Sequence, residues 1–244
     1  MKILVTGANG YIGLHIVKTL LDKGIQVIAC DLNTDEVDKR AERKNIDLFT
    51  LPDTNIYTLL GTPDVCLHLA WRNGFVHNAS THLGDLSAHY RFLTRIIDGL
   101  PQLAVMGTMH EIGYWEGAID ENTPCNPLSM YGIAKDALRR CMMQYAQQKG
   151  CILQWLRGYY ILGDDKKNNS IFCKLLLADE EGRETFPFTT GKNKYDFITV
   201  DKLAEIISAV IMQREVTGII NCCTGQPISL AERVEQFIQE HGLK

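Results

Sequence analysis

A tyrosine and a lysine four residues apart, Tyr131 and Lys135, have the types and the spacing needed for acid–base chemistry on an oxygen atom. On a helix this spacing places both side chains on one face, about one turn apart. An ammonium group beside a phenol, with the charge of a cofactor nearby, favours the phenolate and lowers the pKa of the phenol. The pair could then exchange a proton with a substrate oxygen near neutral pH.

Thr108 is the candidate third member of this site. It follows the apolar run 103–106, which predicts a strand, so it stands at the carboxyl end of that strand. Its hydroxyl could there hydrogen-bond the same substrate oxygen as Tyr131. A lone threonine in this place is more often a helix cap or a turn residue, and only the joint pattern with Tyr131 and Lys135 favours a catalytic role.

Glycines recur at positions 7, 10 and 13, between a predicted strand at 3–5 and a predicted helix that follows Gly13. Glycine permits a tight strand-to-helix turn and lets backbone N–H groups approach a pyrophosphate. A second predicted strand, 25–29, leads to Asp31, whose carboxylate can accept a hydrogen bond from a ribose 2′-hydroxyl. This context predicts a dinucleotide site. The alternative is a tight turn in an α/β protein that binds no cofactor.

The elements that must position these residues alternate between strand and helix. Further strands are expected at 46–49, 64–70, 103–106 and 151–156, helices at 86–100 and 128–148, and a charged, solvated stretch at 35–44. Such alternation predicts an α/β fold with a doubly wound parallel sheet of the Rossmann type.

From residue 163 onward the pattern loosens. The sequence predicts a polar loop at 164–169, a helix at 171–177, a charged stretch at 180–194, a strand at 197–200, a helix at 201–212, a strand at 218–222 and a last helix from 229. We expect residues 1–162 to form an NAD(P)-binding domain. Residues 163–244 are expected to form a small substrate-binding cap over the carboxyl edge of the sheet, with segments returning to the core.

Composition narrows the class of protein. A net charge of −4 over 244 residues does not suggest a nucleic-acid partner. There is no apolar run long enough for a membrane helix and no apolar signal core, and the scattered cysteines indicate reduced thiols in a cytoplasmic protein. His77, His82 and His89 lack metal-ligand spacing, so we expect them on the surface or in loops, and we expect no metal.

The chain resembles the extended short-chain dehydrogenase/reductases of the nucleotide-sugar epimerase/dehydratase group. The motifs that carry the resemblance are 6–13, Asp31, 47–48, 68–70, Thr108, 126–135, Arg157, 196–201 and 224–230. The resemblance implies that Thr108, Tyr131 and Lys135 are catalytic, and that Lys135 also holds the nicotinamide ribose. It further implies a homodimer, joined by two helices from each subunit that include the one carrying Tyr131.

The resemblance also implies NAD as the cofactor. The implied contacts are Gly7, Gly10, Tyr11, Ile12, Gly13, Asp31, Leu32, Asp47, Leu48, Leu69, Ala70, Trp71, Tyr131 and Lys135. NADP is less favoured, because an NADP enzyme of this group usually carries an arginine just after the second strand, whereas 32–34 has no positive charge.

The chain departs from the family pattern where substrates bind. Met109 and His110 stand where related dehydratases carry an acid and a base, and a methionine cannot replace the cysteine with which related epimerase-reductases move a carbon-bound proton. His110 could serve as a base only if it faces the cleft. Tyr160 and Tyr195 replace an asparagine and an arginine that usually contact the substrate phosphates.

The candidate substrate residues are therefore Trp71, Arg72, Met109, His110, Tyr160, Lys167 and Tyr195. A solvated surface role explains Arg72 and Lys167 as well.

We expect an oxidoreductase that transfers a hydride between NAD(P)H and C4 of a nucleotide-linked, dTDP-bound 6-deoxy-4-keto hexose. A 4-epimerase that retains its NAD is the first alternative. A non-catalytic NAD-sensing protein is the second, and the intact Thr108, Tyr131 and Lys135 argue against it.

Overall fold

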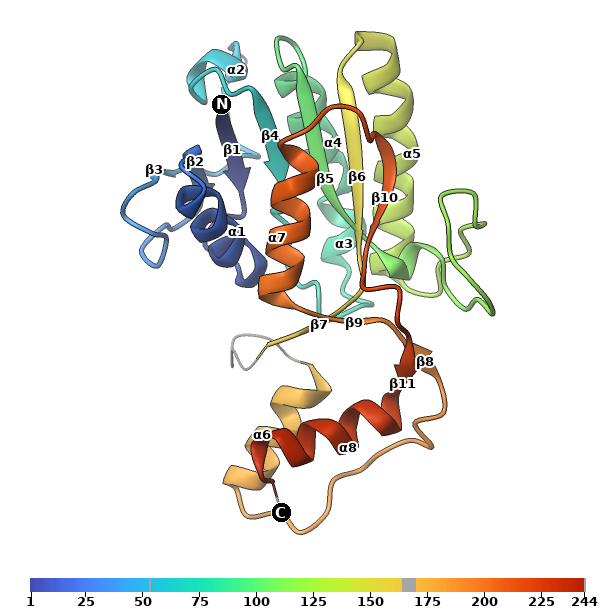
Figure 1. Ribbon diagram of the computed structural model, residues 1–244. Helices are drawn as coiled ribbons and strands as arrows, with labels where there is room; N and C mark the ends of the chain where they lie inside the picture. The colour runs from blue at the N-terminus through green and yellow to red at the C-terminus, as the bar shows by residue number, and fades with distance from the viewer. Residues whose placement is uncertain (53, 164–169, 244) are drawn as a thin grey trace.

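The computed structural model describes residues 1–52, 54–163 and 170–243, and its main feature is a parallel seven-stranded sheet (Figure 1). The strands are β1 (Lys2–Thr6), β2 (Gln26–Asp31), β3 (Glu42–Asn45), β4 (Val65–His68), β5 (Gln102–Thr108), β6 (Ile152–Gly158) and β10 (Gly218–Cys222). Their spatial order is β10-β6-β5-β4-β1-β2-β3. The order reverses at β1, so a crevice for ligands is expected at the carboxyl ends of β1 and β4. The predicted doubly wound parallel sheet is confirmed.

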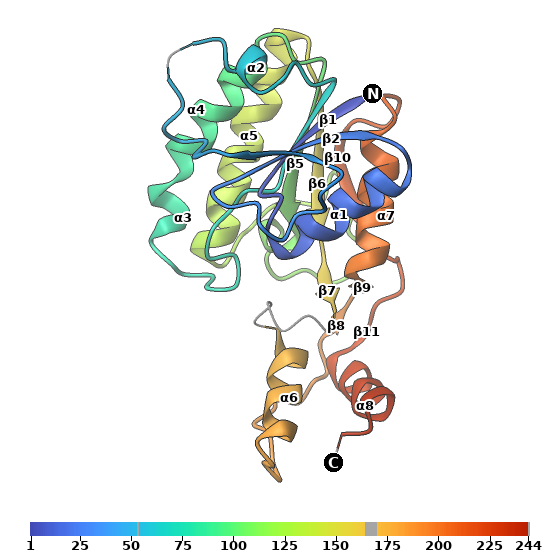
Figure 2. The same ribbon diagram turned by 90° about the vertical axis from the view of Figure 1, so that its left-hand side faces the viewer.

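Helices cover both faces of this sheet (Figure 2). One face carries α1 (Tyr11–Asp22) and α7 (Val200–Ile211), and the other carries α2 (Ile56–Leu59), α3 (Thr81–Gly84), α4 (Leu86–Ile96) and α5 (Met130–Lys149). Side chains alternate between the faces along each strand, as strand geometry requires. Ile3 and Val5 pack in the core under α1 and α7, whereas Leu4 packs in the core under α4 and α5. Burial on both faces explains why the central strands read as nearly continuous apolar runs.

A smaller lobe lies beyond the carboxyl edge of the sheet (Figure 1). It contains α6 (Ile171–Glu180), β8 (Lys194–Tyr195), β11 (Ile228–Ser229) and α8 (Leu230–His241). Phe172, Leu175, Val234 and Phe237 form its own buried core. The short pair β7 (Tyr160–Leu162) and β9 (Phe197–Thr199) connects the lobe to the sheet, and α7 and β10 return to the main core.

The third strand differs from the prediction. We expected it at 46–49 and read 35–44 as solvated, but β3 is Glu42–Asn45. It is the edge of the sheet and pairs only with β2 among the described strands. An edge strand needs backbone pairing rather than an apolar pattern, and charged residues there are common because they prevent edge-to-edge association. The apolar residues that suggested the strand, Ile46 and Phe49, pack against the core after β3 has ended.

Other boundaries moved by a few residues. The helix expected at 86–100 ends at Ile96, and the one expected at 128–148 starts at Met130, where the Ser129 side chain caps it by accepting from the Gly132 N–H. The loop expected at 164–169 lies outside the described residues. Each of the eight cysteines is a free thiol. Within the described part of the chain, no helix has the length and apolar character needed to span a membrane.

Candidate active site

The glycine-rich turn joins β1 to α1 and lies tightly against the segment after β4. Gly7 has a φ of +71°, and a Cβ on it would lie 2.6 Å from the Ala70 nitrogen. A Cβ on Gly13 would lie 2.2 Å from the Gly7 oxygen, so neither position accepts a larger residue. Helix α1 begins after Gly10 with no side chain capping its first N–H groups. An uncapped helix N-terminus with a close backbone approach suits a pyrophosphate.

Asp31 ends β2 beside this turn. Its carboxylate accepts hydrogen bonds from the Asn9 N–H at 2.9 Å and from the Leu32 N–H at 2.8 Å. A carboxylate has about four acceptor sites, so Asp31 can still accept from ribose hydroxyls. The Leu32 side chain is largely exposed at the same edge. These residues fit a dinucleotide whose ribose has a free 2′-hydroxyl.

The remaining predicted cofactor residues lie along the same carboxyl edge. The Ile46 N–H donates to the Asp31 carbonyl at 2.8 Å, which places the next two residues, Asp47 and Leu48, beside Asp31. The Leu48 side chain is buried in the core, while Asp47 accepts from the Phe49 N–H at 2.9 Å. Leu69 and Ala70 directly follow β4, and Tyr11 and Ile12 begin α1.

Thr108 ends β5, Tyr131 lies in the first turn of α5, and the two residues meet there. Thr108 is the last residue of β5, and the short 3₁₀ turn η1 (Met109–Glu111) follows it. Helix α5 touches this turn, because a Cβ on Gly132 would lie 2.3 Å from the His110 oxygen. Burial raises the pKa of Tyr131 to about 12, and a hydrogen bond with Thr108 acts in the opposite direction. Hence the expected lowering of the phenol's pKa by Lys135 is not seen here: burial is the larger effect.

Lys135 lies buried one turn further along α5. Its Nζ donates to the Met106 carbonyl at 2.7 Å and lies 3.9 Å from the centre of a Trp71 ring. It is 6.0 Å from the centre of the Tyr131 ring. Burial lowers the pKa of Lys135 to about 7, and the negative charge of Glu111 raises it. The ammonium is therefore close to losing its proton at neutral pH.

Histidine and tryptophan rings surround Tyr131. His77 lies parallel to it with ring centres 5.8 Å apart, and the centres of His82, His110 and Trp71 lie 5.2, 5.8 and 6.2 Å away. His110 thus faces this site, as the base hypothesis requires. Burial and nearby His77 lower the pKa of His110 to about 4, so it is neutral at pH 7.

The expectation that His82 and His89 lie on the surface or in loops was wrong. They lie in helices α3 and α4 and are only 1% and 2% exposed. The Trp71 indole N–H donates to His82 Nδ1 at 3.0 Å, so the His82 proton must lie on Nε2, from which it donates to the Val76 carbonyl at 2.9 Å. His89 contacts His68 Nε2 at 3.0 Å and stacks on Trp71. One signal was available: His89 lies three, four and seven residues before the buried Phe92, Leu93 and Ile96, on the apolar face of α4.

The predicted substrate residues are partly brought together. Met109 and His110 form η1 beside Tyr131, and Tyr160 lies 6.4 Å from His110 and 4.3 Å from Tyr195 between ring centres. Arg72 is different, because its largely exposed side chain pairs with Asp85. Lys167 lies outside the described residues. Among the residues that are described, no three histidine, cysteine, aspartate or glutamate side chains are grouped to hold a metal ion.

Known proteins resemble this chain in sequence and in fold. Residues 3–223 match the model of the NAD-dependent epimerase/dehydratase family. The chain is 46% identical over 249 aligned residues to the dTDP-6-deoxy-L-talose 4-dehydrogenase (NAD⁺) of Aggregatibacter actinomycetemcomitans, covering 100% of this chain and 92% of the relative.

Two solved structures share the fold. UDP-glucose 4-epimerase of Thermotoga maritima with UDP-glucose has a TM-score of 0.87 at 20% identity, covering 100% of this chain and 84% of that one. UDP-glucuronic acid 4-epimerase of Bacillus cereus with UDP-glucuronic acid and NAD has a TM-score of 0.84 at 21% identity, with the same coverage of 100% and 84%.

Proposed function

Since the chain belongs to the NAD-dependent epimerase/dehydratase family and is a nucleotide-sugar oxidoreductase that uses NAD, we propose that it interconverts the C4 hydroxyl and the C4 ketone of a dTDP-linked 6-deoxyhexose. The observation that carries the proposal is the meeting of Thr108 and Tyr131 at the carboxyl end of β5, with Lys135 one turn along α5. The 46% identity to a 4-dehydrogenase over the whole chain supports the choice of C4 and of the dTDP sugar.

Each of the three residues has a proposed task. In the oxidative direction the Tyr131 phenolate takes the O4–H proton while Thr108 hydrogen-bonds O4, and the C4–H bond breaks with its electron pair as C4=O forms. In the reductive direction Tyr131 returns the proton to O4. Bound NAD supplies the hydride acceptor or donor. Lys135 is proposed to hold ribose hydroxyls and, in the molecules in which its amine keeps a proton, to favour the phenolate.

The cofactor site is proposed along the carboxyl edge of β1, β2 and β4. The pyrophosphate would lie over the turn that contains Gly7, Gly10, Tyr11, Ile12 and Gly13. Asp31 and Leu32 would contact the adenosine ribose, Asp47 and Leu48 the adenine, and Leu69, Ala70 and Trp71 the middle of the cofactor. The close turn and the uncapped start of α1 support this placement.

The sugar is proposed to lie between Tyr131 and the smaller lobe, with residues 163–244 acting as the substrate cap except for α7 and β10, which return to the core. The rings of His77, His110, Tyr160 and Tyr195 lie in this region, so its described part offers apolar ring faces and imidazole nitrogens. Such walls suit a sugar whose C6 is a methyl group. Met109 and His110 do not supply the acid–base pair of a dehydratase, which leaves hydride transfer as the chemistry.

The test is oxidation of dTDP-6-deoxy-L-talose with NAD⁺. We expect absorbance at 340 nm to rise by one NADH per sugar oxidised. No net absorbance change with sugar interconversion would indicate a 4-epimerase instead, and NAD binding without turnover would indicate a sensor. Running the reaction in D₂O with an enzyme-free control adds a second check: enzyme-dependent deuterium at C3 or C5 of the sugar would contradict simple hydride transfer at C4.

Asp31→Ala should weaken the preference for NAD over NADP. The Asp31 carboxylate repels a 2′-phosphate and can accept a hydrogen bond from a 2′-hydroxyl, so its removal should narrow the gap between the two binding free energies by about 1–3 kcal/mol. Calorimetric titration of NADH and NADPH measures this gap, and Asp35→Ala, on an exposed residue nearby, is the matched control. Tighter binding of NADPH than NADH by the wild-type enzyme would refute the role of Asp31.

The homodimer and the cytoplasmic location stay predictions.

A further inference from the structure

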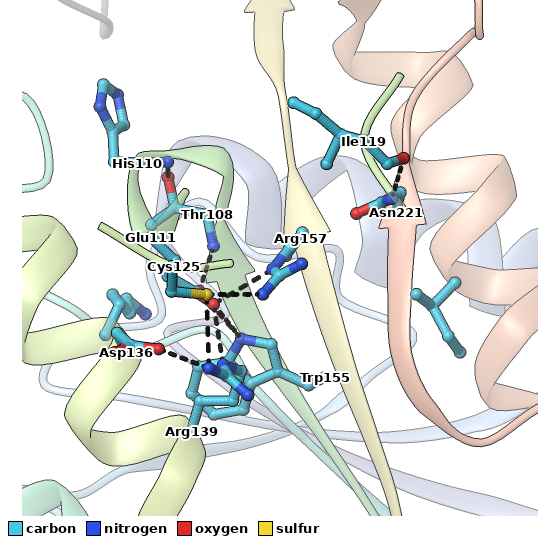
Figure 3. A network of polar contacts seen from close by, with 12 residues as sticks. Thr108, His110, Glu111, Ile119, Cys125, Asp136, Arg139, Trp155, Arg157 and Asn221 are labelled. Atoms are coloured by element: carbon cyan, nitrogen blue, oxygen red, sulfur yellow. Dashed lines mark hydrogen bonds and ion pairs between the residues drawn. The ribbon is translucent and has the colours of Figure 1, made fainter. Parts of the chain in front are cut away.

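Glu111 is a fully buried carboxylate directly beside Thr108, and the family motifs do not include it (Figure 3). Its Oε1 accepts from the Thr108 backbone N–H at 2.8 Å and from the Trp155 indole N–H at 2.9 Å. Its Oε2 accepts from Arg157 Nε at 3.3 Å and forms an ion pair with Arg139 Nε, also at 3.3 Å. One carboxylate thus joins β5, α5 and β6.

The surrounding backbone is shaped to admit this group. A Cβ on Gly107 would lie 2.2 Å from Trp155 Nε1 and 2.7 Å from Glu111 Oε1, so only glycine leaves room for both. The Thr108 hydroxyl accepts from the His110 N–H at 3.2 Å, which closes the turn η1 over the carboxylate. Glu111 therefore holds the backbone N–H of Thr108, and the His110 N–H of η1 holds its side-chain hydroxyl.

The charge of Glu111 also acts on the two titrating residues of the site. It raises the pKa of Tyr131 and the pKa of Lys135. The charged groups that face Glu111 are Arg139 from α5 and Arg157 from β6. Around them, Cys125 Sγ accepts from both arginines, and Asp136 pairs with Arg139. The titratable rings that face Tyr131 are those of His77, His82 and His110. His89 stacks on Trp71, whose ring also lies 3.9 Å from Lys135 Nζ.

We propose that Glu111 is the positioning residue of this active site: its carboxylate holds Thr108 in place against α5 and β6, and its negative charge acts on Tyr131 and Lys135. The proposal rests on the proposed function of those three residues. If Glu111 served only the fold, a folded variant that keeps its charge but not its length would retain the wild-type kcat.

Two substitutions separate the reach of Glu111 from its charge. Glu111→Gln keeps the length and an acceptor for the Thr108 N–H but removes the charge. Glu111→Asp keeps the charge but is one methylene too short to hold Thr108 as observed. Glu116→Gln makes the same change on an exposed residue a few positions further along and serves as the control.

NADH affinity against pH is the first readout, because it needs no sugar. The midpoint is the pH at which half of the change in NADH affinity has occurred. We assign this midpoint to Lys135 if the pH dependence disappears in Lys135→Met. The midpoint should move to lower pH in Glu111→Gln, since removal of a negative charge makes the ammonium less favourable, and should stay unchanged in Glu111→Asp and Glu116→Gln. An unmoved midpoint in a folded Glu111→Gln enzyme would overturn the electrostatic half of the proposal.

Turnover is the second readout. Glu111→Asp should lower kcat by roughly 10- to 100-fold, the scale of a misplacement of about 1 Å, with little change in NADH affinity. Wild-type kcat in this variant would overturn the positioning half.

If neither Glu111 variant folds, Trp155→Phe tests the same proposal, because it removes one hydrogen-bond donor to the carboxylate and keeps the charge. The kcat should then fall while the pH midpoint of NADH affinity stays unmoved, and an unchanged kcat would count against the proposal. A wild-type enzyme that fails to oxidise the sugar refutes the proposed function, while the NADH midpoint still tests Glu111.

Discussion

Tyr131→Phe is expected to lower turnover by roughly 10²–10⁴-fold while NAD affinity stays close to that of the wild-type enzyme. The substitution removes only the hydroxyl that exchanges the proton with O4 and keeps the ring, so its contacts with His77 and Trp71 remain. Steady-state assays at 340 nm measure kcat, and calorimetry measures NAD affinity. Tyr114→Phe makes the same change on an exposed phenol and should leave both values unchanged.

The pH dependence of the wild-type oxidation rate tests the same role of Tyr131. Burial raises the pKa of Tyr131 to about 12, so the phenolate needed for oxidation is scarce at neutral pH. The oxidation rate should therefore rise with pH through the range 7–9. The reduction rate uses the protonated phenol, which is the main form throughout that range, so Tyr131 contributes no such rise there. Full activity of Tyr131→Phe, or an oxidation rate that falls as pH rises from 7 to 9, would contradict the role of Tyr131 as the proton carrier.

The central part of the fold could be predicted from the sequence because its signals are local. Strands such as β1 and β4 are buried on both faces and therefore appear as short apolar runs, and the glycines of the turn are needed for backbone reasons that act within a few residues. The edge strand β3 carries no such signal, since its side chains are mostly exposed and polar. Its position is decided by pairing with β2, which the spacing of apolar residues does not reveal.

The candidate site likewise contains residues that the sequence reveals and residues that it does not. Thr108, Tyr131 and Lys135 were found because their spacing and their neighbours in the chain are informative. Glu111 was missed because a lone glutamate ordinarily predicts a solvated position. It is buried here only because Trp155 and Arg157, 44 and 46 residues away in the sequence, come to meet it. His82 was missed for a similar reason, since its partner Trp71 belongs to the segment after β4.

Lys135→Met should abolish turnover to at least the extent of Tyr131→Phe and, unlike that variant, should also weaken NAD binding by tenfold or more. The Lys135 ammonium is proposed to serve both the phenolate and the ribose hydroxyls, and loss of a charged hydrogen-bond donor is worth about 1.5–3 kcal/mol. Methionine has a similar length and adapts to irregular apolar surroundings, so it can fill the space beside Trp71. Titration of NADH followed by fluorescence measures the affinity.

The thermal stability of Lys135→Met separates a loss of function from a loss of fold. The pKa of Lys135 is lowered from an ordinary 10.5 to about 7, so the folded protein is destabilised wherever this lysine must be charged. That penalty is complete below pH 7 and disappears as pH rises toward 10.5. The variant should therefore melt at or above the wild-type Tm, with its largest advantage at pH 7 and below. Lys149→Met, on an exposed lysine of the same helix, should show neither effect. Wild-type NAD affinity in Lys135→Met would confine the role of Lys135 to Tyr131, and wild-type turnover would refute the proposed site.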